Sequence, residues 1–102
     1  MEKSYPMQSP QVPSELLALR EEIDSIDSEL MDLLAKRFQV TARVGELKAR
    51  NRLESVDPVR EQEKLERLRQ LAKDKSLNSE FILDMFQTIF DEVVKNHRSY
   101  LK

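Results

Sequence analysis

Hydrophobic residues recur at alternating intervals of three and four positions along the first half of the chain. This spacing is typical of a helix that packs along its length against another helix. The seam consists of Leu16, Leu19, Ile23, Ile26, Leu30, Leu33, Arg37, Val40, Val44 and Leu47. No proline interrupts the pattern, and Ser14 is well placed to be an N-cap. The sequence therefore predicts a single helix of about 36 residues, from the residue after Ser14 to about Arg50.

Two shorter helices are predicted after the first. Asp57 is expected to cap the start of the second helix, with Pro58 at its first helical position. That helix is expected to end near Asp74, and the third is expected to begin at Asn78 or Ser79. The apolar stripe of the third helix consists of Ile82, Phe86, Ile89, Phe90, Val93 and His97.

The first 13 residues differ from the rest of the chain because they hold three of its four prolines and show little periodicity. We expect a flexible leader over residues 1–13 and one helical domain over residues 14–102. A chain of 102 residues forms at most one domain. A single glycine and an abundance of Ala, Glu, Lys, Leu and Arg are typical of long helices, so we predict an all-α fold of three helices.

The predicted first helix is too long for a compact domain of this size. About 36 residues at ~1.5 Å each span roughly 54 Å. A compact domain of about 100 residues is only roughly 34 Å across. Two shorter helices cannot cover such a seam, so we expect a second copy of the chain to lie along it in an intertwined homodimer.

Charge and composition exclude several classes of function. The net charge of -2 and the pI near 5.5 argue against a nucleic-acid partner, which requires a basic face. The chain has no cysteine, hence no disulfide or thiol chemistry, which fits a cytoplasmic location. No apolar run approaches the roughly 18 residues of a membrane span, and no signal-peptide pattern opens the chain. With one histidine and no cysteine, we expect no metal site.

Two cations interrupt the core-facing stripe of the first helix, namely Arg37 and, three turns later, Lys48. They are separated by about 20° around the helix axis and about 16.5 Å along it. The space between their head groups would suit a small anion with two acceptor ends, above Thr41 and Val44. The alternative is that both side chains reach solvent from the edge of the seam or pair with carboxylates. The spacing alone leaves both interpretations open.

Four further residues are candidates for a binding site. Arg20 could close the pocket of a partner chain in an antiparallel dimer, or form a surface ion pair with Asp24. Glu61 lies on the inward stripe of the second helix and could accept hydrogen bonds from ligand hydroxyls, with Arg60 pairing a ligand carboxylate. The alternative is that Glu61 compensates the helix dipole and Arg60 is solvated. His97 could be an N–H donor into a cavity or a satisfied core histidine.

Taken together, these segments resemble the all-helical chorismate mutases. The resemblance rests on the runs "LLALREEIDSIDSELMDLLAKR", "VGELK" and "DPVREQEKLERL" and on the closing amphipathic helix, and it covers residues 16 to about 101. It implies an intertwined helical dimer with two active sites, each lined mostly by one chain. It also implies the conversion of chorismate to prephenate in phenylalanine and tyrosine biosynthesis, without a metal or cofactor.

The resemblance also assigns roles to the cations of the first helix. Arg37 and the partner's Arg20 are implied to grip the substrate carboxylates. Lys48 is implied to donate to the ether oxygen whose bond breaks. These roles agree with the interpretation in which an anion lies between Arg37 and Lys48.

Five residues of the second and third helices complete the implied site. Asp57 and Glu61 resemble the acceptors near the ring hydroxyl, and Arg60 resembles a further arginine of the site. His97 stands where many relatives have glutamine or glutamate as a second donor to the ether oxygen. Val93 stands where some relatives offer a serine hydroxyl. The implied substrate-binding set is Arg20, Arg37, Lys48, Asp57, Arg60, Glu61, Val93 and His97, and the implied catalytic set is Lys48, Arg37, His97 and Glu61.

The implied reaction is a pericyclic rearrangement, which needs no nucleophile. It is helped by holding a flexible dianion in its compact form and by fixed donors at the ether oxygen, each worth about 3 kcal/mol. Because a protonated histidine donates more strongly than a neutral one, we expect activity to weaken as pH rises through about 6.5. Other functions remain open: an isochorismate pyruvate lyase or aminodeoxychorismate mutase on the same fold, or a non-catalytic helical dimerisation module.

Overall fold

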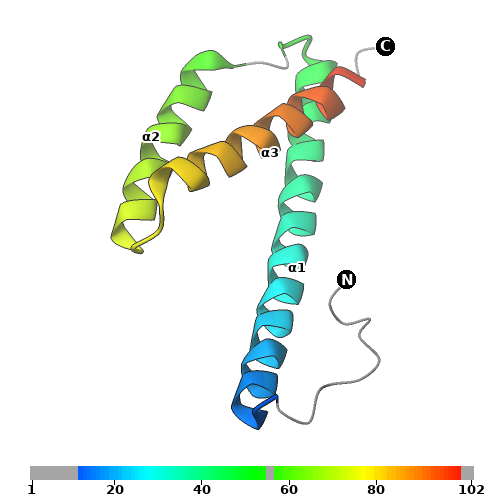
Figure 1. The fold of residues 1–102 in the computed structure, drawn as a ribbon. Coiled ribbons are helices and arrows are strands. Elements are labelled where there is room, and N and C mark those ends of the chain that lie inside the picture. Colours follow the sequence, from blue (N-terminus) through cyan, green and yellow to red (C-terminus); the bar gives the residue numbers. More distant parts are fainter. Residues whose placement is uncertain (1–11, 55–56, 100–102) are drawn as a thin grey trace. The chain divides into compact units, whose positions relative to one another are not determined.

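The protein consists of three α-helices, as the sequence predicts (Figure 1). The computed structural model describes residues 12–54 and 57–99. Helix α1 spans Ser14–Arg50, α2 spans Pro58–Asp74 and α3 spans Ser79–Ser99. The expected leader lies outside the described residues from residue 1 to residue 11, as do residues 100–102 of the expected helical domain.

Helix α1 starts one residue earlier than its predicted cap allows. Ser14 is already the first helical residue, and the carbonyl of Pro13 accepts hydrogen bonds from the amides of Leu16 and Leu17. The prediction of Ser14 as N-cap is therefore wrong, because the carbonyl oxygen of the preceding proline accepts the first helical hydrogen bond. Glu15 lies in the first turn, where its negative charge interacts favourably with the positive end of the helix dipole.

The C-terminal end of α1 is closed by a Schellman motif. Arg52 has a positive φ of 55°, and the amide of Leu53 donates to the carbonyl of Lys48 at 2.7 Å. The amide of Arg52 donates to the carbonyl of Ala49 at 3.1 Å. These bonds satisfy carbonyls that the helix end would otherwise leave unpaired, and they fix the backbone that carries Lys48.

Helix α2 begins as predicted. Asp57 is its N-cap and accepts a hydrogen bond at 3.2 Å from the backbone amide of Arg60, and Pro58 occupies the first helical position. At the other end, Ser76 has a φ of 59°, and the amide of Leu77 donates to the carbonyl of Ala72 at 2.8 Å. This is a second Schellman motif, again without glycine at the left-handed position.

Helix α3 is capped by Asn78, whose side-chain oxygen accepts from the amide of Phe81 at 3.1 Å. Figure 1 shows α2 and α3 packed side by side after the short turn that joins them. The core that they form is small. In the described part of the chain, only Gly45, Ala72, Phe90 and His97 are buried. A single chain therefore covers little of its own apolar surface.

The chain divides into two units, the first ending at Lys36 and the second starting at Arg37. In the first unit the apolar seam of α1 is exposed to solvent, and its side chains are between 39% and 60% exposed. These are Leu16, Leu19, Ile23, Ile26, Leu30 and Leu33. Among the described residues, none of the helices combines the length and hydrophobicity that crossing a membrane requires.

Candidate active site

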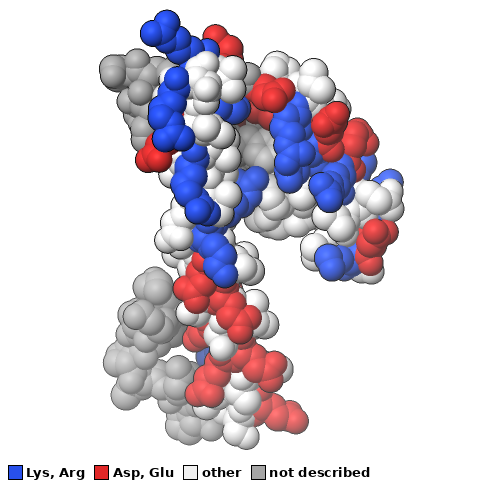
Figure 2. Space-filling model, turned by 180° about the vertical axis from the view of Figure 1, so that it is seen from behind, with Lys and Arg blue, Asp and Glu red and all other residues white. Residues whose placement is uncertain are grey.

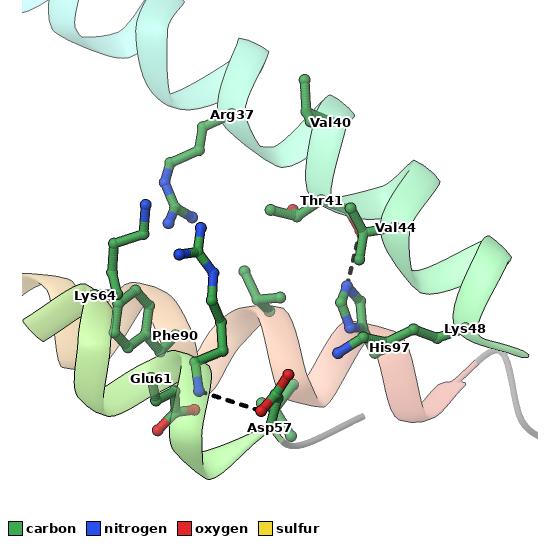
Figure 3. Close-up of a pocket in the computed structure, with 13 residues that line it drawn as sticks. Arg37, Val40, Thr41, Val44, Lys48, Asp57, Glu61, Lys64, Phe90 and His97 are labelled. Atoms are coloured by element: carbon green, nitrogen blue, oxygen red, sulfur yellow. Dashed lines mark hydrogen bonds between the residues drawn. The ribbon is translucent and has the colours of Figure 1, made fainter. Parts of the chain in front are cut away.

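The second unit contains a cavity of about 370 Å³, a size typical of a small-molecule site. The C-terminal part of α1, the start of α2 and the second half of α3 contribute to it (Figure 3). Seven of the eight predicted substrate-binding residues line this cavity: Arg37, Lys48, Asp57, Arg60, Glu61, Val93 and His97. The eighth, Arg20, belongs to the first unit and is not part of this lining.

Arg37 is half-buried and faces the cavity. The central carbon of its guanidinium lies 5.8 Å from the centre of the Phe86 ring and 5.9 Å from that of Phe90, within range of cation–π attraction. Its Nη1 atom is buried and has no hydrogen-bond partner. Burial lowers the pKa of Arg37 below its ordinary value, and the positive charge of Arg60 lowers it further. An unpaired, desolvated cation of this kind favours an anionic ligand.

His97 is buried and is held by the backbone of α1. Its Nε2 atom lies 2.8 Å from the carbonyl oxygen of Thr41. Because a carbonyl only accepts, Nε2 must carry the proton and donate it. Gly45 lies one turn beyond Thr41 and is the buried residue of α1.

The orientation of His97 sharpens the expectation that it donates to a ligand. Its Nδ1 atom is buried and has no partner. In the neutral imidazole the one N–H is used on Thr41, so Nδ1 can only accept a hydrogen bond. In the imidazolium Nδ1 is also a donor. Donation from His97 to a ligand therefore requires the protonated ring, and a neutral donor is excluded in this geometry.

Cations outnumber carboxylates around the cavity. Four cationic side chains line it, Arg37, Lys48, Arg60 and Lys64, but only two carboxylates, Asp57 and Glu61. Among the residues that the structure describes, no ion pair joins these two groups. The site therefore keeps an excess of two positive charges when His97 is neutral, which matches a ligand with two negative charges.

The charged groups are divided between two ends of the cavity (Figure 3). Arg37 and Lys64 point toward one another at one end, and Lys48 lies beside His97 at the other. The carboxylate of Glu61 is turned away from Arg37. Asp57 combines two roles, since it lines the cavity and also accepts from the backbone amide of Arg60. Arg37 and Lys48 both line this cavity, and among the described residues neither forms an ion pair with a carboxylate.

The sequence analysis did not single out Lys64. It follows Arg60 by four residues and Glu61 by three, so all three lie on one face of α2. Burial lowers the pKa of Lys64, and the positive charges of Arg60, Arg37 and Arg67 lower it further, in that order. Its helical spacing from Arg60 and Glu61 was the signal in the sequence that could have identified Lys64 as a lining residue.

The walls between the charged groups are mostly apolar. They are formed by Val40, Val44, Phe90, Val93 and Val94, together with Thr41, whose hydroxyl donates to the carbonyl of Phe38 at 3.2 Å. Among the described residues, no three acidic or histidine side chains gather in a way that could hold a metal ion. The arrangement can therefore fix both ends of a small dianion around an apolar middle.

The chain is similar in sequence to known proteins. The chain matches the family described as chorismate mutase type II over residues 19–98. A bifunctional chorismate mutase/prephenate dehydratase of Buchnera aphidicola subsp. Schizaphis graminum is 36% identical over 88 residues, which cover 86% of this chain and 23% of that protein. The Escherichia coli (strain K12) protein of the same name is 37% identical over 87 residues, which cover 85% of this chain and 22% of that protein.

A third relative is the T-protein of Enterobacter agglomerans, which is 40% identical over 79 residues. The match covers 78% of this chain and 21% of the T-protein. The chain thus spans less than a quarter of the length of these curated relatives.

Proposed function

Since the chain belongs to the chorismate mutase type II family, we propose that it converts chorismate to prephenate. The observation that carries this proposal is the excess of cations around the cavity. Among the described residues these four cations form no ion pair with the two carboxylates of the lining, and Nη1 of Arg37 is buried without a partner. Chorismate is a small dianion with an apolar ring, and it complements both the charge and the apolar walls.

In the proposed mechanism the protein acts by restraint and electrostatics. One carbon–oxygen bond breaks and one carbon–carbon bond forms within the same molecule, so no side chain needs to attack the substrate. Arg37 holds a carboxylate at one end of the cavity, and the apolar walls keep the substrate compact. Lys48 donates to the ether oxygen, where negative charge grows in the transition state. Such donors cost no reorganisation when they are fixed beforehand.

His97 is proposed as the second donor to the ether oxygen, in its protonated form. His97 lies beside Lys48 at the same end of the cavity (Figure 3), and its Nδ1 atom is the ring nitrogen that the backbone of α1 does not engage. A charged N–H donor at that oxygen would stabilise developing negative charge more than a neutral one. Asp57 and Glu61 are proposed to accept hydrogen bonds from the ring hydroxyl, with Arg60 as a further cation of the site.

We further propose that two copies of the chain form an antiparallel, intertwined dimer. The open seam of the first unit and the small core support this, because large exposed apolar surfaces are typical of interfaces. Charge supports the antiparallel direction. Between residues 14 and 36, seven acidic residues face two basic ones, whereas residues 37–50 hold four basic residues and one acidic one. Figure 2 shows the acidic side chains along the first part of α1 and the basic ones along its second part.

In such a dimer the acidic part of one α1 lies beside the basic part of the other, and Arg20 reaches the partner's cavity. The proposal thus assigns to Arg20 the second carboxylate grip, contributed across the interface. A cytoplasmic location is part of the proposal as well, supported by the absence of cysteine.

The direct test is the loss of chorismate absorbance on adding the purified protein. We expect turnover by the wild type and a roughly 100- to 1,000-fold lower kcat/KM for Lys48→Ala, the effect of removing one fixed donor. Arg43→Ala is the matched control, since Arg43 is an exposed cation on the same helix outside the cavity lining. Product analysis with isochorismate, scoring released pyruvate, separates the lyase alternative. Absence of turnover on either substrate would leave the aminodeoxychorismate mutase and the non-catalytic module.

A further inference from the structure

Lys64 has the position of a ligand-binding residue. It extends from α2 into the cavity, is half-buried, and points toward the guanidinium of Arg37 from the opposite wall (Figure 3). Among the described residues, its ammonium has no hydrogen-bond or ion-pair partner. A lysine that served only to cover apolar surface would extend its head group into solvent instead.

The charges that face Lys64 are repulsive. Arg37 on α1 and both Arg60 and Arg67 on α2 lower its pKa, after the larger effect of burial. From α3 the cavity lining near this end is apolar, with Phe90 and no acidic residue. The carboxylate of Glu61 is turned away from this group.

Such an arrangement costs stability in the empty protein, because like charges are brought together in a partly desolvated place. An anion placed between Arg37 and Lys64 removes this cost and gains two charge-assisted hydrogen bonds. Uncompensated clusters of perturbed cations in a cavity are typical of binding sites rather than of structural ion-pair networks.

We infer that Lys64 is a further substrate-binding residue, which holds one carboxylate of the substrate together with Arg37. The inference rests on the proposed function and deepens it. It assigns two cations of the same chain, one from α1 and one from α2, to a single carboxylate. The other end of the cavity, with Lys48 and His97, is left to the ether oxygen.

The test uses the full chain with Lys64→Met, which keeps the apolar stem and removes the charge. Because this contact exists in both the bound substrate and the transition state, we expect KM to rise roughly 10- to 100-fold with kcat within about threefold. Lys64→Arg should restore most of the affinity. Lys73→Met is the matched control on the same helix, because Lys73 is exposed and outside the lining, and its KM should stay within about twofold of the wild-type value.

Two more readouts separate binding from a structural role. A structural role predicts a lower melting temperature for Lys64→Met, whereas removing a repulsive charge should leave it unchanged or raise it. The pH dependence gives the second readout. Since the pKa of Lys64 is lowered, the wild-type lysine loses its proton earlier than an ordinary lysine as pH rises, and KM should then increase. In the Lys64→Arg variant the arginine at position 64 stays charged and Lys48 is unchanged. Its KM should therefore rise less than the wild-type KM over the same alkaline range.

Failure of the inference is distinguishable from failure of the proposed function. Normal turnover by the wild type with an unchanged KM in Lys64→Met would overturn the role of Lys64 alone. If the wild type does not turn chorismate over, calorimetric titration with chorismate tests the role of Lys64 in binding. Weaker binding by Lys64→Met would support the inference without the reaction, and equal binding, or none by the wild type, would overturn it.

Discussion

The two units of the chain follow the same hydrophobic pattern but use it differently. In the first unit every seam position from Leu16 to Leu33 is apolar, and these side chains lie open to solvent. In the second unit the pattern continues with Arg37 at a seam position and Lys48 next to Leu47. There the apolar helix face becomes one wall of a cavity with an excess of positive charge.

The difference teaches which deviations from a regular pattern carry chemistry. An uninterrupted apolar seam specifies association, because its side chains are stabilised by packing against any complementary apolar helix face. A cation at a seam position costs free energy unless an anion compensates it, so it is retained where it binds something. On this account the first unit supplies assembly and the second supplies the site, with Arg20 as the one contribution of the first unit to catalysis.

The largest expected effect comes from breaking the seam of the first unit. Ile26→Asp places a charge in the proposed interface in both copies, at about 3–5 kcal/mol for each uncompensated buried charge. We expect monomers by light scattering and a loss of activity of more than about 1,000-fold, although the cavity residues are unchanged. Ser28→Asp adds the same charge to the same part of α1 at an exposed position off the seam, and should remain a fully active dimer. An active monomeric Ile26→Asp would refute the division of roles.

A smaller effect is expected from the pH dependence of the second unit. Since Nε2 of His97 donates to Thr41, only the protonated ring can donate from Nδ1 to the substrate. We expect kcat/KM to be roughly 10- to 100-fold higher with the protonated ring than with the neutral ring, the value of one charge-assisted hydrogen bond. His97→Gln, which donates through its amide at any pH, should show a nearly flat profile. A flat wild-type profile from about pH 5 to 8, with His97→Gln equally active, would remove His97 from the mechanism.

The smallest effect compares the same substitution in both units. Ser76 has a positive φ at the end of α2, which glycine adopts without steric cost, so Ser76→Gly should raise the free energy of unfolding by about 0.5–1 kcal/mol. Ser25 is in the middle of α1, where glycine is unfavourable, and Ser25→Gly should lower it by a similar amount. Chemical denaturation measures both. Equal signs for the two changes would contradict the Schellman geometry of Ser76.

Much of the fold was predictable because its signals are local. Helix periodicity and the Asp57–Pro58 start depend on residues a few positions apart, and the structure confirms them. The start of α1 was predicted one residue too late. Pro13 has no amide hydrogen to donate, but its carbonyl accepts the first hydrogen bonds of the helix, so Ser14 is already helical. The candidate site was predictable where charge interrupted an apolar stripe, as at Arg37.

The rest depends on contacts between distant parts of the chain. The hydrogen bond between His97 and Thr41 joins residues 56 positions apart, so no local pattern fixes which ring nitrogen the backbone engages. Lys64 was missed because a lysine at the edge of an amphipathic stripe is usually solvated. Only the packing of its helix around the cavity shows that its head group faces Arg37.

The central claim is that a complete site needs the second unit of one chain and the first unit of another. Mixing two inactive variants, Arg20→Ala and Lys48→Ala, after joint unfolding and refolding tests it most directly. If Arg20 acts across the interface, each mixed dimer holds one site with both residues intact, and activity should return to about a quarter of the wild-type value. If the mixture is no more active than the two variants apart, Arg20 does not complete the partner's cavity and the claim is wrong.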